Sequence, residues 1–108
     1  MGWAFTDAAL PTPMPADPAA VRHEPEHDRF TLATDHGDAR VEYLRQDDVL
    51  ALVHTEVPPP AEGQGIGSAL VQGTLDLIRE HGWTMRPQCP FVAAYVERHD
   101  EYADLVAG

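Results

Sequence analysis

Residues 61–82, AEGQGIGSALVQGTLDLIREHG, join a glycine-rich loop to the pattern of an amphipathic helix. Apolar side chains recur at helical spacing after the loop, which predicts one buried face and one polar face. Gly82 directly follows this pattern, and glycine at that place is typical of a helix C-terminus. We therefore predict a helix that begins at Ile66 or Gly67 and ends at His81.

Three β-strands are predicted ahead of the loop. Residues 29–34 (RFTLAT) and 39–45 (ARVEYLR) alternate apolar and polar side chains, so each strand has one buried face. The glycine-containing turn between them predicts a hairpin. Residues 49–57 (VLALVHTEV) are the most apolar segment, largely apolar on both faces, which predicts a central strand. Three such strands in a row form an antiparallel meander.

The segments after the helix complete the predicted fold. WTMRPQ (83–88) is expected to form a strand parallel to 49–57, because a helix separates the two. PFVAAYVERH (90–99) predicts a helix that opens on a proline, and residues 100–106 extend or restart it with Asp100 as the N-cap. The predicted fold class is α+β: an antiparallel β meander that continues into a β-α-β-α core, with helices packed on a mixed sheet.

Length and composition predict one domain behind a leader. Four prolines among residues 1–20 disfavour a helix or a central strand there, so we expect a loosely ordered leader and a single domain over 21–108. No apolar run approaches the ~20 residues that span a bilayer. The N-terminus lacks the pattern of a signal peptide, which favours a cytoplasmic location. We expect a monomer.

The charge of the chain is strongly negative. Eighteen acidic residues stand against seven arginines and no lysine, which gives a formal net charge of −11. This balance argues against binding to a nucleic-acid backbone, whose affinity depends on cationic side chains. It favours the approach of cationic molecules such as amines, and a merely solubilising acidic surface explains it equally well.

Two features of the sequence are candidates for a metal or redox site. His23 and His27 lie four residues apart in HEPEH, but Pro25 opposes the helix that would align both imidazoles, so we expect no metal site. Cys89 is the single cysteine and cannot form an internal disulfide. It is either a buried small hydrophobe or a working thiol.

The glycine loop has the spacing G-x-G-x-G. This is neither the dinucleotide fingerprint nor the mononucleotide P-loop. A loop before a helix N-terminus exposes free N–H groups at the positive end of the helix dipole, and glycines allow a phosphate to approach closely. Spacing alone leaves two interpretations open: a tight turn or an anion site.

The surrounding residues favour the anion site. HTEVPPPAEGQGIGSALVQGTLDLIREHG (54–82) resembles the central motif of the GNAT acetyltransferase superfamily, Arg/Gln-x-x-Gly-x-Gly/Ala, which falls here on Glu62, Gly65 and Gly67. PQCPFVAAYVERHDEYADLV (87–106) is similar to the C-terminal signature of a small single-domain GNAT-like family. The combined resemblance covers residues 21–106.

The resemblance implies that acetyl-CoA is the co-substrate. Its pyrophosphate would bind the loop amides, and its pantetheine arm would lie where the preceding strand splays from its parallel neighbour. The implied cofactor-binding residues are Glu56, Val57, Gly63, Gln64, Gly65, Ile66, Gly67 and Ser68. Glu62 departs from the superfamily, because a carboxylate near a pyrophosphate is repulsive unless it turns outward. Asp100 replaces a proline of the small family.

Three residues are candidates for catalysis, each with a structural alternative. Cys89, before a predicted helix N-terminus, is either a thiol that takes the acetyl group or one that lines the pocket. Tyr95 could protonate the departing CoA thiolate, as the superfamily implies, or pack against the sheet. His54 is a base in the cleft or, as we favour, a core histidine; it shares a strand face with Glu56.

The predicted function is therefore acetyl-CoA-dependent N-acetyl transfer to an amine, such as an exposed lysine or peptide amine. One alternative is a CoA- or acyl-CoA-binding module with little or no transferase activity. Another is an α+β interaction domain whose glycines only make a turn.

Overall fold

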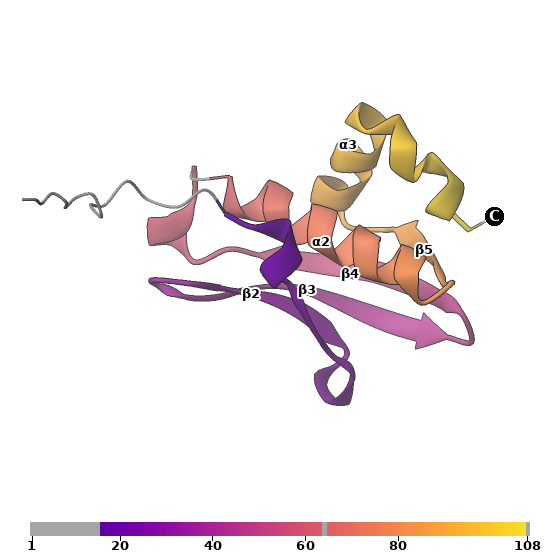
Figure 1. The fold of residues 1–108 in the computed structure, drawn as a ribbon, viewed down its shortest axis with the longest axis horizontal. Helices are drawn as coiled ribbons and strands as arrows, with labels where there is room; N and C mark the ends of the chain where they lie inside the picture. Colours follow the sequence, from indigo (N-terminus) through magenta and orange to yellow (C-terminus); the bar gives the residue numbers. More distant parts are fainter. Residues whose placement is uncertain (1–15, 64, 108) are drawn as a thin grey trace, which may run out of the picture.

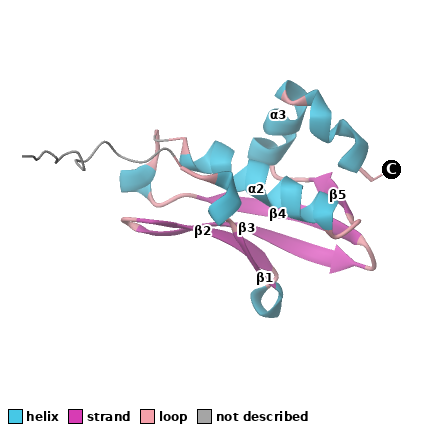
Figure 2. Ribbon diagram, in the orientation of Figure 1, coloured by secondary structure: helices cyan, strands magenta, loops and turns pink. Residues whose placement is uncertain are grey.

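The structure is a computed structural model that describes residues 16–63 and 65–107. Its centre is a five-stranded sheet in the order β1-β2-β3-β4-β5, in which β5 pairs parallel to β4 and the other pairs are antiparallel (Figures 1 and 2). The strands are β1 (Arg22–Glu24), β2 (Arg29–Thr34), β3 (Gly37–Gln46), β4 (Val49–Glu56) and β5 (Thr84–Pro87). The predicted α+β fold with a mixed sheet is confirmed.

Within the described residues, two α-helices and four short 3-10 helices accompany the sheet. They are η1 (Pro18–Ala20), η2 (Pro25–His27), η3 (Pro59–Ala61), α2 (Ile66–Glu80), α3 (Pro90–Arg98) and η4 (Asp100–Leu105). Helices α2 and α3 lie on the same side of the sheet (Figure 1). Neither is long and apolar enough to cross a membrane, and the same holds for every other helix in the described ranges.

The core lies between α2 and the sheet. The five apolar positions that predicted the amphipathic helix, Ile66, Leu70, Val71, Leu75 and Ile78, are all buried. They pack with buried residues of the strands, among them Phe30, Val41, Leu50, Leu52 and Met85. The residues of α2 therefore form a helix chiefly because this face covers the sheet.

The prediction that 49–57 forms a central strand is confirmed, because β4 pairs with β3 and with β5, although β4 is buried on one face only. Leu50 and Leu52 are fully buried, whereas Val49, Ala51 and Val53 are only half-buried. β4 has hydrogen-bonded neighbours on both sides, which accounts for its apolar sequence. However, α2 and α3 lie on one face of the sheet (Figure 2), and alternate residues of a strand point to opposite faces, so half of the residues of β4 point away from these helices.

A β-bulge in β4 changes which residues face the helices. Leu52 pairs with Tyr43 and His54 pairs with Glu42, so Val53 is an extra residue between two consecutive pairs. An extra residue shifts the alternation of side chains by one position. Beyond Val53, the odd-numbered residues of β4 face the helices.

The HEPEH segment opens the sheet. β1 adds a short strand at the edge, and η2 makes the turn into β2. The His23 ring stacks on Phe30 at 4.4 Å between centroids, and its Nε2 lies 2.7 Å from the Tyr43 hydroxyl. His23 is thus a structural residue of the sheet edge.

The C-terminal segment folds back on α2. η4 restarts the helix in 3-10 form after α3, and His99 is the residue at its N-cap position, so the prediction of Asp100 as N-cap is wrong. The Tyr102 hydroxyl donates to Asp76 at 2.7 Å, and Arg79 donates to Asp104 at 2.8 Å. These contacts tie η4 to the polar side of α2.

Candidate active site at the start of helix α2

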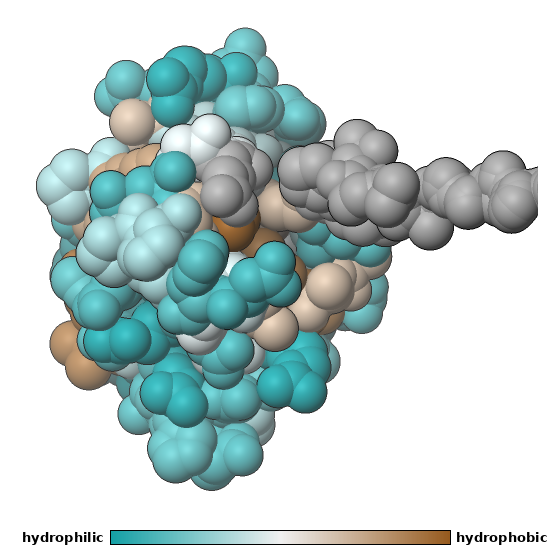
Figure 3. All heavy atoms as spheres, turned by 90° about the vertical axis from the view of Figure 1, so that its left-hand side faces the viewer, coloured by the Kyte–Doolittle hydropathy of each residue, from teal (hydrophilic) through white to brown (hydrophobic). Residues whose placement is uncertain are grey.

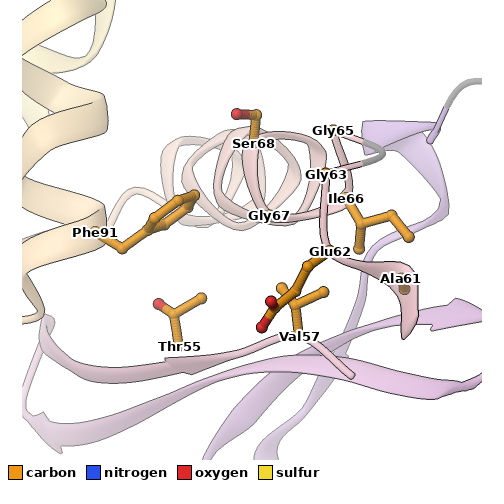
Figure 4. Close-up of a pocket in the computed structure, with 10 residues that line it drawn as sticks. All are labelled: Thr55, Val57, Ala61, Glu62, Gly63, Gly65, Ile66, Gly67, Ser68 and Phe91. Carbon is orange, nitrogen blue, oxygen red and sulfur yellow. The ribbon is translucent and has the colours of Figure 1, made fainter. Parts of the chain in front are cut away.

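A pocket of about 430 Å³ lies where the end of β4, the start of α2 and the start of α3 meet (Figure 4). Its lining residues are Thr55, Val57, Ala61, Glu62, Gly63, Gly65, Ile66, Gly67, Ser68 and Phe91. Six of the predicted cofactor-binding residues are therefore brought together: Val57, Gly63, Gly65, Ile66, Gly67 and Ser68. Gln64 and most of the predicted leader, residues 1–15, lie outside the described residues.

The loop before α2 depends on glycine for its backbone conformation. Gly63 has φ +85° and Gly65 has φ +76°, in the left-handed region that side chains other than glycine rarely adopt. A Cβ atom at either position would meet no atom of the described chain within 4 Å. The glycines therefore leave open space above the loop as well as allowing its turn.

The first turn of α2 presents backbone donors that have no side-chain cap among the described residues. Gly65 occupies the N-cap position and has no side chain to cap the helix. The Ala69 amide makes the first bond of the helix, to the Gly65 carbonyl at 3.0 Å. The N–H groups of Ile66, Gly67 and Ser68 consequently have no acceptor within the helix, and the positive end of the helix dipole lies among them. This arrangement suits an anion.

Glu62 is the one charged residue that lines the pocket in the described chain. It is exposed, and in Figure 4 its carboxylate points toward β4 rather than toward the start of α2. It therefore does not cap the free amides. Glu62 nevertheless contributes negative charge to the pocket, so it does not turn out of the site altogether. Figure 3 views the molecule from the end where β4 leads into η3, and this end is largely hydrophilic.

The pairing of β4 with β5 stops beside the pocket. Leu52 and Pro87 are the last paired residues, and the Cys89 amide then donates to the Leu52 carbonyl at 2.8 Å. From that point the chain turns into α3, whereas β4 continues to Glu56. The end of β4 thus faces the N-terminus of a helix instead of a neighbouring strand on that side.

Cys89 lies at this junction. It is 6% exposed, and its thiol donates to the Thr55 hydroxyl across a distance of 3.4 Å between Sγ and Oγ1. Burial raises the pKa of the Cys89 thiol. Hydrogen bonds from the Thr55 hydroxyl and from the backbone N–H groups of Val92, Phe91 and Thr55 outweigh burial, so the pKa lies below its ordinary value. A thiolate at this place is stabilised as at other helix N-termini.

Phe91 forms the α3 side of the pocket. Its ring lies against Gly67, where an added Cβ would come within 2.8 Å of the ring's Cζ atom. Gly67 therefore permits a close approach of α3 to α2. Sequence patterns did not identify Phe91 or Thr55 as pocket residues. The CPF motif at the start of α3 could have indicated Phe91. Nothing in the sequence indicated Thr55, because its place in the pocket depends on the bulge.

His54 and Glu56 lie on the other face of β4. His54 Nε2 is 3.2 Å from Glu56 Oε1, as expected for residues that share a face, and Arg40 donates to the same carboxylate at 2.9 Å. The His54 side chain is 53% exposed, so the interpretation of His54 as a core histidine is wrong. Neither residue lines the pocket, because the bulge directs Thr55 and Val57 there.

Tyr95 is buried on α3 and 4% exposed. Its ring stacks on His99 at 3.9 Å, and His99 Nδ1 lies 2.8 Å from the Tyr95 carbonyl. Burial raises the pKa of Tyr95, and the nearby carboxylates of Glu101 and Asp76 raise it further. Tyr95 is not among the residues that line the pocket. It packs as a buried helical tyrosine would.

Comparisons with known proteins agree with this architecture. The sequence profile of the GCN5-related N-acetyl-transferase family matches residues 29–105, and the chain therefore belongs to this family. Among solved structures, the chain is similar to the NMR structure of a protein from Staphylococcus aureus described as a "GCN5-like putative N-acetyltransferase". The TM-score is 0.63 at 22% identity, over 83% of this chain and 89% of the other. No curated protein matches the sequence.

Proposed function

We propose that this chain is an N-acetyltransferase that transfers the acetyl group of acetyl-CoA to an amine. The observation that carries the proposal is the first turn of α2, which has no side-chain cap and opens into a pocket beside the hydrogen-bonded pair of half-buried Thr55 and buried Cys89. Family membership supports the same reaction type.

The backbone of the loop would bind the donor. We assign its diphosphate to the amides of residues 63–68, including Gln64, because N–H groups at a helix N-terminus bind anions without cationic side chains. The amides of Glu56 and Val57, at the open end of β4, would polarise the thioester carbonyl. Phe91 and Val57 would enclose the acyl end of the donor.

The transfer makes one bond and breaks another. The amine nitrogen attacks the carbonyl carbon, a C–N bond forms, and the electrons of the broken C–S bond leave with CoA as a thiolate. The amine loses one proton, and the thiolate gains one. Cys89 could enter in either of two ways: its thiolate could take the acetyl group first and pass it to the amine, or it could have only a structural role beside the pocket. Cys89 is not itself a lining residue, but it is hydrogen-bonded to Thr55, which is. We assign no step to His54 or Tyr95, since neither lines the pocket and neither side chain is hydrogen-bonded to a lining residue in the described chain.

The test is a calorimetric titration with CoA of the wild type, Ser68→Asp and Ser68→Asn. Ser68 is the third residue of α2 and lines the pocket. A carboxylate there favours the helix through its dipole but competes with a diphosphate. We expect Ser68→Asp to lose at least tenfold in affinity with an unchanged or higher Tm, and Ser68→Asn to bind within about threefold of the wild type. Equal affinity in Ser68→Asp would refute the binding mode.

A CoA-binding module without transferase activity is the second candidate. The pocket favours it in one respect: its described lining contains no histidine, and Glu62 is its one ionisable side chain that could take the proton of the amine. CoA release from acetyl-CoA in the presence of peptides with a free lysine or α-amine separates the two functions. Tight CoA binding with no turnover above the uncatalysed rate would favour the module.

A further inference from the structure

The pocket lacks cationic side chains. Its described lining contains no arginine, lysine or histidine, and the one charged residue is Glu62. An anionic donor would therefore be held by backbone amides at the start of α2, which provide partial positive charge but no full charge. Only the phosphates that reach those amides therefore contribute favourable electrostatic energy to binding.

The arginines of the chain are placed elsewhere. There is no lysine, and no arginine occurs between Arg45 and Arg79, a stretch that contains β4, the loop and the first turns of α2. Arg79 is paired with Asp104, and the Arg45 guanidinium lies over the Trp83 ring at 4.5 Å. Arg40 is bound to Glu42 and Glu56 on the other face of the sheet.

The remaining arginines do not line the pocket either. Arg29 pairs with Glu24 at the far edge of the sheet, at 2.6 Å. Arg22 is in β1, which is separated from β4 by two strands, or about 14 Å across the sheet. Arg98 ends α3, about 10 Å along the helix from Phe91. Arg86 faces a different hollow, with Ala51 and Leu44.

CoA carries a phosphate that the loop amides cannot serve. Its 3′-phosphate is on the ribose, beyond the diphosphate, and has a charge of about −1.5 to −2 near pH 7. The described lining of the pocket offers this phosphate no cationic side chain, its one charged residue is Glu62, and the chain has a net charge of −11. Each of these makes the additional charge unfavourable or, at best, neutral.

From this we infer that the pocket recognises the pantetheine and diphosphate segment of the donor and does not select for the 3′-phosphate, so that thioesters of dephospho-CoA bind at least as tightly as those of CoA. The inference rests on the proposed function. Under this inference, the acyl donors of the protein include thioesters of dephospho-CoA as well as those of CoA. Glu62 then acts as the residue that disfavours more highly charged ligands.

The experiment compares CoA and dephospho-CoA by calorimetry with the full chain at low and at physiological salt. We expect the two dissociation constants to agree within about threefold at physiological salt, with dephospho-CoA the tighter ligand at low salt, because salt screens repulsion. Binding of CoA more than tenfold tighter than dephospho-CoA would overturn the inference and leave the proposed function intact. If neither ligand binds, the proposed function fails as well.

Glu62→Gln is the matched variant, because it removes the charge and keeps the shape. We expect it to tighten CoA more than dephospho-CoA, since CoA has the additional charge to be repelled. An unchanged ratio of the two affinities in Glu62→Gln would contradict the role given to Glu62. As a control, the Tm of this variant is compared with that of the wild type, and we expect the two values to agree.

Discussion

The thiol of Cys89, at the start of α3, donates a hydrogen bond to the hydroxyl of Thr55 on β4, with Sγ and Oγ1 3.4 Å apart. The two residues are 34 positions apart in the chain. The bulge at Val53 brings Thr55 to this face of the sheet, and the end of β5 brings Cys89 to the same height. Because Thr55 lines the pocket, this hydrogen bond holds the thiol of Cys89, the candidate nucleophile, next to the pocket.

Thr55→Val should raise the pKa of Cys89. The Thr55 hydroxyl is one of the groups that stabilise the thiolate, and valine has the same shape without the hydroxyl. We expect Cys89 in Thr55→Val to react more slowly with iodoacetamide near neutral pH, and its reactivity to rise only at higher pH. Thr55→Ser keeps the hydroxyl and should react like the wild type. Identical pH profiles for all three proteins would show that Thr55 does not control this thiol.

Cys89 with a lowered pKa is expected to accept the acetyl group when no amine is present. Intact mass spectrometry after incubation with acetyl-CoA should show an increase of about 42 Da, as for one acetyl group on a nucleophile. Peptide mapping should place it on Cys89, and Cys89→Ser is the control. If the wild type turns over acetyl-CoA without any such adduct, the transfer to the amine is direct and Cys89 has only a structural role beside the pocket.

Gly73→Ala should destabilise the fold although alanine favours helices. An added Cβ would come within 2.3 Å of the Pro18 carbonyl oxygen and 2.4 Å of a Val21 methyl group. The gain in helix propensity is about 1 kcal/mol, and overpacking of this kind costs about 1–3 kcal/mol. Because a backbone oxygen cannot rotate away, we expect the cost to dominate and the urea midpoint to fall. Glu80→Ala, at an exposed position of the same helix, should change the midpoint little.

Tyr102→Phe should lower stability near neutral pH by about 1 kcal/mol, the usual contribution of one hydrogen bond, here the 2.7 Å bond to Asp76. A thermal scan of the two proteins at pH 7 measures this difference. Equal midpoints would mean that the bond contributes nothing to stability.

Alkaline pH should reduce the stability of the wild type. Burial raises the pKa of Tyr102, and the hydrogen bond to Asp76 raises it further. Burial likewise raises the pKa of Tyr43 and of Tyr95. In the unfolded chain these groups lose their protons near pH 10. Above that pH the folded state binds more protons than the unfolded state, so the free energy of unfolding falls as pH rises. The fall between pH 9 and 11 should be smaller in Tyr102→Phe, and an equal fall would contradict the assignment.

Local patterns in the sequence predicted most of the fold. The helical spacing from Ile66 to Ile78 and the glycine at 82 were sufficient to place α2, which the structure has at Ile66–Glu80. Gly82 has φ +75°, as expected for a residue that ends a helix. The strands of the meander were identified in the same way, because alternation reports on one buried face. The glycine loop was likewise predicted from the amino-acid sequence alone.

Tertiary structure decided which side chains enter the site. Alternation along β4 correctly separated His54 from Thr55, but the face that each one takes depends on the extra residue in the pairing with β3. A bulge is a property of two paired strands, so the sequence of one strand does not reveal it. Likewise, Phe91 reaches the pocket because Gly67 lets two helices approach, a contact between residues distant in the chain.

By itself, then, the sequence determined the order of β2 to β5, α2 and α3 and a glycine loop at a helix start, since these depend on residues that are neighbours in the chain. The short edge strand β1 was not predicted. Only the folded chain decided that Thr55, Glu62 and Phe91 line the pocket, and that His54 does not. The physical reason is that strand register and helix packing are set by contacts across the whole core, where a shift of one residue turns a side chain to the opposite face.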